Sequence, residues 1–553
     1  MTSATPDTAL PEYAAEWLDH NLPPRVPAGE VVAGWLTLLN RGCKTWQPGA
    51  FQIAVDLDGA RVFHVALPHA VGTSERLTLC WVFRVTRELG QHEFCLDLVE
   101  EGVTTFEHQG VPPLRVAFEV FEQPVSVNSS LRDEVLATHA RCWLPCDGVS
   151  WSRGGPGYPQ FARHARGCRL VDVDGREYVD FLMGWGTALL GYAHPRVQAA
   201  VAAALSSGAT TTVTPQLMPE VAARLRAVFP GAEAATFGKN GSDVCTAAVR
   251  MARVYTGRPI VLYCGYHGWQ DWYAQRYGFA ATGIPAAPEP LLVPFPPNDL
   301  AEVARLFDSH HGRVAAVMLE PAGVIESSSG PIRDADPTFL RALAELVRRE
   351  GALLVFDEIL TGFRHLGGSV QAAAGVVPDL TCLGKALSGG MPLAALVGRK
   401  ELFDAAIGRI CFEPTFKGES YSFAAARESL AIYAEQDVPA RIAAFGNRLR
   451  ATIGELCRAA GVAAEAVGPP FRMMVVFAEP DARRRHLQRT LLQQELMKHG
   501  VLTTQNLLLP SIAHDDEALA VVARAFERAF AVVAEAERRD RYASHLEIPP
   551  LPG

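Results

Sequence analysis

Hydrophobic and polar residues follow one pattern before residue 122 and a different one after residue 131. From about Pro11 to Glu122 they alternate in short runs, which is the period of strands with one buried face. Phe51 to Leu57 is such a run, Asp58-Gly59 supplies a tight turn, and Arg61 to Leu67 returns with the same period, which predicts a hairpin. Three more strands are predicted at Leu77 to Val85, His92 to Val99 and Leu114 to Phe121. The pattern therefore predicts a small antiparallel sandwich.

A polar segment from Gln123 to Ser130 interrupts this pattern, and we place a linker there. Beyond it, Pro195 to Ser206 and Pro219 to Phe229 have the spacing of amphipathic helices. Val314 to Leu319 and Ala352 to Phe356 are short apolar runs, which are typical of buried parallel strands. The alternation of helices and strands predicts an α/β core of about 400 residues.

Length and composition are those of a globular protein with more than one domain. The 553 residues exceed the ~250–300 residues at which a single core stops growing. A net charge of -9 without a basic cluster argues against nucleic acid as a main partner. Met1 to Leu10 lacks the basic and apolar regions of a signal peptide, and no apolar run approaches the ~20 residues that span a bilayer. These features predict a cytoplasmic enzyme without a membrane partner.

The eleven cysteines are scattered along the chain, without the paired CxxC blocks of zinc ribbons. Cys142 and Cys146 lie close to His139, but burial as small hydrophobic residues is expected for them rather than metal binding. We therefore predict reduced thiols and no metal.

Candidate chemistry begins at Asp357, where an apolar strand ends in two carboxylates, Asp357 and Glu358. Ligands of open α/β sheets bind beyond the carboxyl ends of the strands. Lys385 follows in a turn of small residues. An aldehyde cofactor needs an amine that forms a Schiff base and a carboxylate that keeps its ring nitrogen protonated, and Lys385 and Asp357 could fill these two roles. Each residue alone has an ordinary alternative, which is a helix cap for the aspartate and a solvated charge for the lysine.

A turn from Phe237 to Asp243 precedes a predicted helix through Ala247 to Arg253. Backbone N–H groups and the positive end of the helix dipole at such a turn can hold a phosphate. A Gly/Ser turn before a helix is also a common cap, so the turn gains meaning only from its position ahead of Lys385.

The ordered motifs of this region resemble those of class III aminotransferases, and most of all the glutamate-1-semialdehyde 2,1-aminomutase group. The motifs are Asn240-Gly-Ser-Asp243, Tyr266-His-Gly268, Glu320-Pro321, Phe356 to Arg364, Pro378 to Lys385 and Gly389-Gly-Met-Pro392. The resemblance covers roughly residues 140 to 535, and it implies a fold type I pyridoxal-phosphate (PLP) transferase with a large α/β domain and a small α+β domain. It places an N-terminal segment of the small domain at 126–190, the large PLP-binding domain at 191–430 and the C-terminal small domain at 431–553.

Residues 1–125 resemble the immunoglobulin-like accessory domains of bacterial polysaccharide-related proteins. The motifs that carry this resemblance are Asn40 to Trp46, whose tryptophan could plug a sandwich, and Gly90 to Phe94 leading into Leu96 to Gly102. The resemblance predicts an all-β accessory domain.

The aminotransferase resemblance assigns a role to each residue that matches a motif. Lys385 would form the Schiff base and move the proton between substrate and cofactor, and Asp357 would pair with the pyridine nitrogen. Ile359 and Tyr266 would cover the two ring faces, and His267 would be either a structural hydrogen bonder or a catalytic group. The phosphate-binding turn would consist of Gly241, Ser242 and Asp243, and Thr415 would reach the phosphate of the neighbouring subunit, which implies a homodimer.

Two departures from the aminomutase pattern concern the substrate. Glu320 to Glu326 lacks the expected asparagine, and Gly148 to Arg153 places Trp151 where a small hydroxyl residue is expected. Candidates for the pocket lining are Trp151, Arg153, Tyr158, Trp185, Trp269 and Tyr421, although burial in a core is an equally common role for aromatic residues. The leading hypothesis is transfer of an amino group from a donor to a carbonyl substrate. The alternatives are intramolecular transfer, as in the aminomutase, and an inert fold that serves as a binding module.

Overall fold

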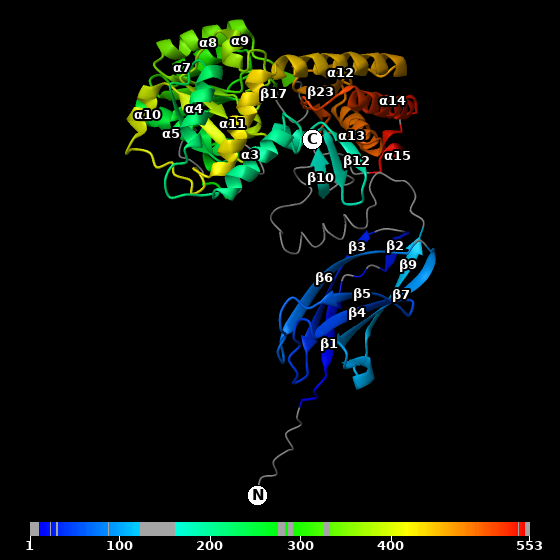
Figure 1. Ribbon diagram of the computed structural model, residues 1–553. Coiled ribbons are helices and arrows are strands. Elements are labelled where there is room, and N and C mark those ends of the chain that lie inside the picture. Colours follow the sequence, from blue (N-terminus) through cyan, green and yellow to red (C-terminus); the bar gives the residue numbers. More distant parts are fainter. Residues whose placement is uncertain are drawn as a thin grey trace. The chain divides into compact units, whose positions relative to one another are not determined.

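A computed structural model of the chain describes residues 10–20, 22, 24–28, 31–86, 88–121, 161–274, 283–285, 291–325, 332–539 and 541–547. The chain divides into two compact units, one of Met1–Arg163 with Asp172–Arg176 and one of His164–Val171 with Glu177–Gly553. Figure 1 shows the blue strands of the first unit and the cyan to red helices and strands of the second. The predicted linker at 123–130 lies outside the described residues.

The described residues of the first unit up to Phe121 form two sheets, which confirms the predicted β region. One sheet has the order β1-β3-β6 and the other the order β2-β9-β7-β4-β5, with β8 paired to β7. The strands are β1 (Ala15–His20), β2 (Arg25–Pro27), β3 (Val31–Asn40), β4 (Phe51–Leu57), β5 (Ala60–Ala66), β6 (Arg76–Arg84), β7 (Gly90–Glu100), β8 (Thr104–Thr105) and β9 (Leu114–Phe121), and a short 3-10 helix spans Glu107–Gln109. The predicted hairpin is present as β4 and β5, which pair antiparallel through Val55 and Phe63.

One pairing in this unit departs from the predicted antiparallel pattern. β2 runs parallel to β9, with Val26 opposite Val120. Pro24 precedes this short strand and Pro27 is its last residue, and because proline has no N–H to donate, it is confined to sheet edges and strand ends. The predicted core plug is confirmed, since Trp46 is fully buried and its ring meets Phe106 edge to face.

The second unit is built on a seven-stranded sheet with the order β13-β21-β20-β19-β16-β14-β15. β21 pairs antiparallel with β13 and β20, whereas the pairs β20-β19, β19-β16, β16-β14 and β14-β15 are parallel. The strands are β13 (Ala234–Gly238), β14 (Ile260–Cys264), β15 (Leu292–Pro294), β16 (Val314–Leu319), β19 (Leu353–Asp357), β20 (Leu380–Leu383) and β21 (Ala394–Gly398). Every residue of β16 is buried, as the predicted parallel strand requires.

Helices accompany this sheet, and their positions agree with the predicted alternation. They are α3 (Pro195–Ser206), α4 (Leu217–Val228), α5 (Gly241–Thr256), α6 (Asp271–Ala274), α7 (Leu300–Ser309), α8 (Pro337–Arg349), α9 (Val370–Ala374), α10 (Lys400–Ala406) and α11 (Ser420–Glu435). α3 has the predicted bounds, and α4 begins two residues before the predicted Pro219 and ends one residue before Phe229. α5 packs against β16, β20 and β21, which fixes its N-terminus at the edge of the sheet where β19 and β20 end.

A second core lies toward the C-terminus and joins residues before position 190 with residues after position 444. Its helices are α12 (Val438–Ala460), α13 (Ala482–Lys498), α14 (Asp516–Arg538) and α15 (Tyr542–His545). Its strands are β10 (Ala162–Arg166), β11 (Arg169–Asp172), β12 (Glu177–Asp180), β22 (Ala464–Val467), β23 (Met473–Phe477), β24 (Val501–Leu502) and β25 (Leu507–Leu508), and the short pair β17 (Val324–Ile325) and β18 (Ile332–Arg333) lies between the two cores in sequence. Among the described residues, no helix combines the length and apolar character that crossing a membrane requires.

Candidate active site

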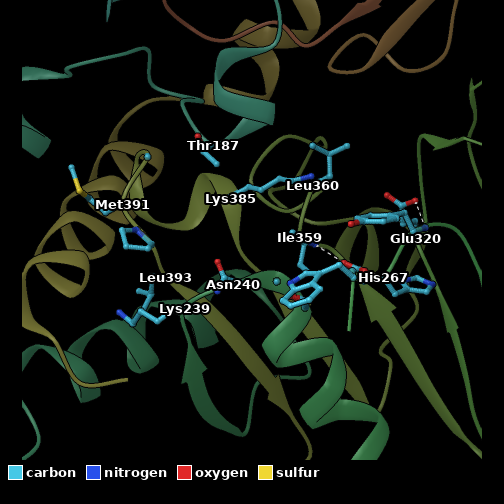
Figure 2. Close-up of a pocket in the computed structure, with 18 residues that line it drawn as sticks. Thr187, Lys239, Asn240, His267, Glu320, Ile359, Leu360, Lys385, Met391 and Leu393 are labelled. Atoms are coloured by element: carbon cyan, nitrogen blue, oxygen red, sulfur yellow. Dashed lines mark hydrogen bonds and ion pairs between the residues drawn. The ribbon is translucent and has the colours of Figure 1, made fainter. Parts of the chain in front are cut away.

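A cavity of about 430 Å³ lies at the carboxyl ends of the parallel strands, where ligands of open α/β sheets bind. Its walls come from the turn before α5, the segment after β14, the end of β16, the segment after β19 and the turn after β20. The lining residues are Thr187, Lys239, Asn240, Gly241, Ser242, Tyr266, His267, Gly268, Trp269, Glu320, Asp357, Ile359, Leu360, Lys385, Gly390, Met391, Pro392 and Leu393. Figure 2 shows Lys385, Ile359, His267 and Glu320 around this space.

Lys385 begins the 3-10 turn after β20 and has a φ of +43°, a backbone conformation that is uncommon for a residue other than glycine. Such strain is typical of functional sites. The hydroxyl of Tyr433 on α11 donates to the Ala386 carbonyl at 2.7 Å and supports the turn. Burial, together with the charge of Arg472, lowers the pKa of Lys385 to about 8. The side chain makes no ion pair with the described residues, so its amine is available to a ligand.

Asp357 is the last residue of β19 and is buried. Its Oδ2 lies 2.8 Å from His267 Nδ1 and accepts from the Cys245 thiol at 3.5 Å, while its Oδ1 accepts from the Ile359 N–H at 3.1 Å. Burial raises the pKa of Cys245, which keeps the thiol protonated as a donor. His267, whose role the sequence left open, therefore contacts Asp357. Sequence reasoning missed Cys245, because a cysteine inside a predicted helix carries no signal of its own.

The turn before α5 has the geometry of an anion site. The Asp243 carboxylate accepts from the N–H groups of Asn240 at 2.9 Å and Lys239 at 3.2 Å and so caps the helix. The N–H groups of Gly241 and Ser242 have no partner among the described residues and remain available to a phosphate. The structure thus places Gly241 and Ser242 on the cavity, whereas Asp243 lies outside its lining and shapes the turn.

The backbone of this turn packs closely against neighbouring residues at two glycines, Gly241 and Gly268. A Cβ on Gly241 would lie 2.6 Å from Cδ1 of Ile359, and a Cβ on Gly268 would lie 2.5 Å from Cβ of Ser242. The turn, Ile359 and the segment after β14 therefore approach as closely as they do only because glycines stand at these positions. Tyr266, predicted for the other ring face, also lines the cavity.

A buried ion pair between Arg472 and Glu320 borders the cavity, and sequence reasoning did not find its arginine. Arg472 Nη1 donates to Glu320 Oε1 at 3.1 Å, and Glu320 Oε2 accepts from the Tyr266 N–H at 3.0 Å. The Glu320-Pro321 motif marked the carboxylate, but Arg472 lies more than a hundred residues later without a motif of its own. The pair places a guanidinium close to Lys385.

The residues predicted to line the substrate pocket lie in different places. Trp269 lines the cavity, Trp185 lies two residues before the lining residue Thr187, and Tyr421 packs against the large core. Trp151, Arg153 and Tyr158 lie outside the described residues. Thr415 is exposed in a turn outside the cavity lining of this chain.

The geometry therefore brings together the amine of the half-buried Lys385, the buried carboxylate of Asp357 and a helix N-terminus around a single space. These groups fit PLP, whose aldehyde, ring nitrogen and phosphate need an amine, an acid and an anion site. His267 Nε2 is buried without a hydrogen-bond partner in the described part of the chain, which agrees with a polar ligand in this cavity. Fold and site together define a PLP-dependent enzyme.

Comparison with known proteins supports the same class. The family described as aminotransferase class-III matches residues 152–529. The 3-aminobutyryl-CoA aminotransferase of Cloacimonas acidaminovorans is 32% identical over 378 residues, which are 68% of this chain and 90% of that protein. The glutamate-1-semialdehyde 2,1-aminomutase of Syntrophobacter fumaroxidans is 36% identical over 316 residues, or 55% of this chain and 72% of that protein.

Solved structures show the same likeness. The FumI protein of Sphingopyxis sp. MTA144, in its PLP internal aldimine form, superposes with a TM-score of 0.69 at 28% identity and covers 76% of this chain and 99% of its own. An omega-transaminase from Sphaerobacter thermophilus gives a TM-score of 0.66 at 27% identity over 73% of this chain and 98% of its own. The chain belongs to the class III aminotransferase family and is a PLP-dependent enzyme of amino-group transfer.

Proposed function

We propose that Lys385 carries the cofactor and that the enzyme moves an amino group from a donor to a carbonyl substrate. The observation that carries the proposal is the position of the half-buried Lys385, which lines the same cavity as the buried Asp357. With its pKa at about 8, about a tenth of this amine is unprotonated at neutral pH, far more than for an ordinary lysine, and can bind an aldehyde. PLP, when bound, supplies a ring that withdraws electrons from the substrate carbon.

The chain's own residues would hold the cofactor and move the proton. Asp357, fixed by His267 and Cys245, would hold a proton at the ring nitrogen, and Ile359 and Tyr266 would confine the ring between them. Gly241 and Ser242 would donate backbone N–H groups to the phosphate. The amine of Lys385, once exchanged for the substrate's amine, would move a proton at the substrate carbon.

Absorbance of the purified protein tests this proposal. Addition of amino donors is expected to convert the absorbance band of the bound aldehyde into that of the amine form, and Lys385→Ala is expected to lose this conversion and the activity. The exposed Lys400→Ala is the matched control, since it pairs with Asp404 away from the cavity. Full activity of Lys385→Ala would refute the proposal. A wild-type protein that shows neither the absorbance band nor activity would favour the inert binding module.

Intramolecular amino transfer is the second candidate, and it is favoured by the 36% identity to the aminomutase of Syntrophobacter fumaroxidans. The two candidates differ in their need for a second substrate. A transaminase requires a separate amino donor and accumulates its keto product, whereas an aminomutase isomerises one compound without a net donor. Measurement of keto product per turnover distinguishes them.

The homodimer implied by Thr415 also remains a proposal. Large apolar side chains stay exposed at the cavity and in the Thr415 turn of the described chain, namely Trp269 at 73% and Phe416 at 60%. Trp269 lines the cavity and is nevertheless exposed to solvent, and a second copy of the chain would cover it. Sedimentation of the purified protein tests the oligomeric state.

The first unit supports a proposal of its own. Its two sheets enclose a core that includes the fully buried Trp46, and this architecture supports an immunoglobulin-like accessory domain. Such a domain could support the dimer or position a sugar or carrier-bound substrate, and deletion of residues 1–125 with assays of oligomeric state and activity separates these roles. The domain boundaries at 125, 190 and 430 and the cytoplasmic location likewise remain predictions.

A further inference from the structure

Arg364 has an environment that the chemistry of Lys385 and Asp357 does not explain. It lies at the end of the Phe356 to Arg364 motif, and only 2% of it is exposed. It forms no ion pair with any described carboxylate. A buried guanidinium without an acid partner is costly unless its hydrogen bonds hold something that the fold needs.

Its hydrogen bonds join two walls of the cavity that are far apart in sequence. Nη1 donates to the Leu360 carbonyl at 2.9 Å, and Nη2 donates to the Gly186 carbonyl. Leu360 lines the cavity, and Gly186 directly precedes the lining residue Thr187. Figure 2 shows Leu360 and Thr187 on either side of Lys385.

The turn that Arg364 holds is unusual. Four consecutive residues, from Met183 to Gly186, have positive φ, and they include Trp185 at +57°. Left-handed turns of this length are disfavoured for L-residues and persist only when their surroundings fix them. Asp180 fixes the start by accepting from the N–H groups of Leu182 at 2.7 Å and Met183 at 3.2 Å. Arg364 holds the end of the turn, together with Thr187 Oγ1, which donates to the Gly184 carbonyl at 3.0 Å.

Close contact at Gly186 shows how tightly the turn is seated. A Cβ at this position would lie 3.0 Å from Cδ1 of Leu360 and 3.2 Å from Nη2 of Arg364. The turn therefore cannot shift toward Leu360 or rotate without breaking the contacts of the guanidinium. This seating determines where Trp185 and Thr187 stand relative to Lys385.

We propose that Arg364 is a positioning residue, which clamps the left-handed turn carrying Trp185 to the Leu360 wall and so fixes the substrate side of the site. A lysine cannot reproduce the clamp, since its single ammonium lacks the planar fork that reaches two carbonyls. The description of this wall as the substrate side rests on the proposed function. The clamp itself does not.

The test uses the full-length protein and two variants, Arg364→Lys and Arg364→Met. Arg258→Met is the matched control, because Arg258 also donates to two backbone carbonyls, those of Val314 at 3.2 Å and Glu350 at 2.8 Å, at the opposite ends of the strands. Hydrogen exchange of the apo-protein reports the turn directly, since the N–H groups of Gly186 and Ala188 are hydrogen-bonded within it. Both Arg364 variants are expected to exchange in this segment about tenfold faster, and Arg258→Met is expected to leave it unchanged.

Kinetics of the loaded enzyme then test the substrate side. Both Arg364 variants are expected to raise the KM for the amino donor more than they lower kcat, because the walls move while Lys385 and Asp357 stay in place. Unchanged exchange in both variants, or equal loosening by Arg258→Met, would overturn the clamp. Faster exchange with an unchanged KM would overturn its role toward substrate. If Arg364→Met fails to fold, Arg364→Lys carries both measurements, and a wild-type protein without aminotransferase activity would refute the proposed function while leaving the exchange result valid.

Discussion

Lys385 combines burial with neighbouring positive charge, and both features bear on the state of its amine. Burial disfavours the charged form, and the charges of Arg472 and Arg364 disfavour it further, while Glu320 and Asp357 act in the opposite direction. The net result is a pKa of about 8, well below that of a solvent-exposed lysine. The pH at which this amine becomes reactive is therefore a property that the site sets.

We expect the rate at which the apo-enzyme takes up PLP to rise with pH and to reach half of its maximum at about pH 8, because only the unprotonated Lys385 amine attacks the aldehyde. Arg472→Gln removes one positive neighbour, so its profile is expected to move to higher pH, whereas Arg472→Lys keeps the charge and is expected to move it less. Stopped-flow absorbance of cofactor uptake between pH 6 and 11 measures the midpoint. A wild-type midpoint near 10.5, the ordinary value for lysine, would contradict the assignment.

His92 in the first unit makes a second pH-dependent prediction. Its Nδ1 lies 2.6 Å from Asp58 Oδ2, and this hydrogen bond raises the pKa of His92 above 6.5. Since the folded-state pKa is the higher one, the pair's stabilisation is fully present below about pH 6.5 and is lost as the pH rises through the raised value. The Asp58→Asn variant is expected to lose this pH dependence.

Deuterium exchange at the histidine C2 position, followed by mass spectrometry across this pH range, gives the pKa of each histidine in the whole chain. His64 is the internal control, because it is exposed and contacts Arg61 instead of a carboxylate. A His92 that titrates at the ordinary value of 6.5, or below it, would show that the hydrogen bond to Asp58 does not shift it.

At the scale of elements, α5 serves both ends of the proposed cofactor site. Gly241 and Ser242 stand at its N-terminus, and Cys245, one turn further, contacts Asp357. The capping carboxylate of Asp243 holds the start of the helix at the cavity edge. A single rigid helix thereby fixes the distance between the anion site and the carboxylate.

Gly241→Ala is expected to weaken cofactor binding, because the added Cβ would lie 2.6 Å from Ile359 and would push the N–H groups of the turn away from the phosphate. A loss of about tenfold in PLP affinity is the expected size, which corresponds to one disturbed anion contact. Gly454→Ala in α12 is the control, since its Cβ would meet only the end of the Arg458 side chain at 3.4 Å. Equilibrium dialysis with PLP measures both, and an equal affinity of Gly241→Ala and wild type would contradict the anion site.

Most helices and strands could be predicted from the sequence, because the spacing of apolar residues and the turn residues determine secondary structure locally. β16 and α3 follow from apolar runs and helical spacing that no distant contact had to correct. The parallel pairing of β2 with β9 could not be predicted, since it depends on where two remote segments meet. The left-handed turn at Met183–Gly186 was equally hidden, because Asp180 and Arg364 fix it from outside.

The residues of the site also fall into those that the sequence could predict and those that it could not. Lys385 and the turn before α5 could be predicted because each motif is contiguous and has a chemical reason of its own. Cys245, Arg472 and Arg364 are brought to the cavity by packing of separate strands and helices, so their roles emerged only in three dimensions.

At the scale of the whole molecule, the site of one chain is open where large apolar side chains are exposed. Trp269 borders the cavity, and Phe416 neighbours Thr415, the residue predicted to reach another subunit's phosphate. Thr415 lies outside the cavity of its own chain, so any contact of this residue with a cofactor would have to be made in a second copy.

Mixed dimers test this arrangement without any structural measurement. Lys385→Ala lacks the cofactor amine, and Thr415→Glu places a negative charge against the phosphate of the partner's site, so each homodimer is expected to be inactive. A mixed dimer contains one site with both substitutions and one site with neither. Random assembly of equal amounts therefore restores about a quarter of the wild-type activity per site.

Co-expression of two differently tagged chains, followed by tandem purification of the mixed dimer, measures this directly. The mixed dimer alone is expected to show about half of the wild-type activity, because one of its two sites is intact. Lys385→Ala paired with Asp357→Asn is the control, since both substitutions fall in the cavity of their own chain and leave neither site intact. If the mixed dimer of Lys385→Ala and Thr415→Glu is as inactive as this control, Thr415 does not serve the partner's site. In that case each site of the mixed dimer carries one of the two substitutions, and neither site is intact.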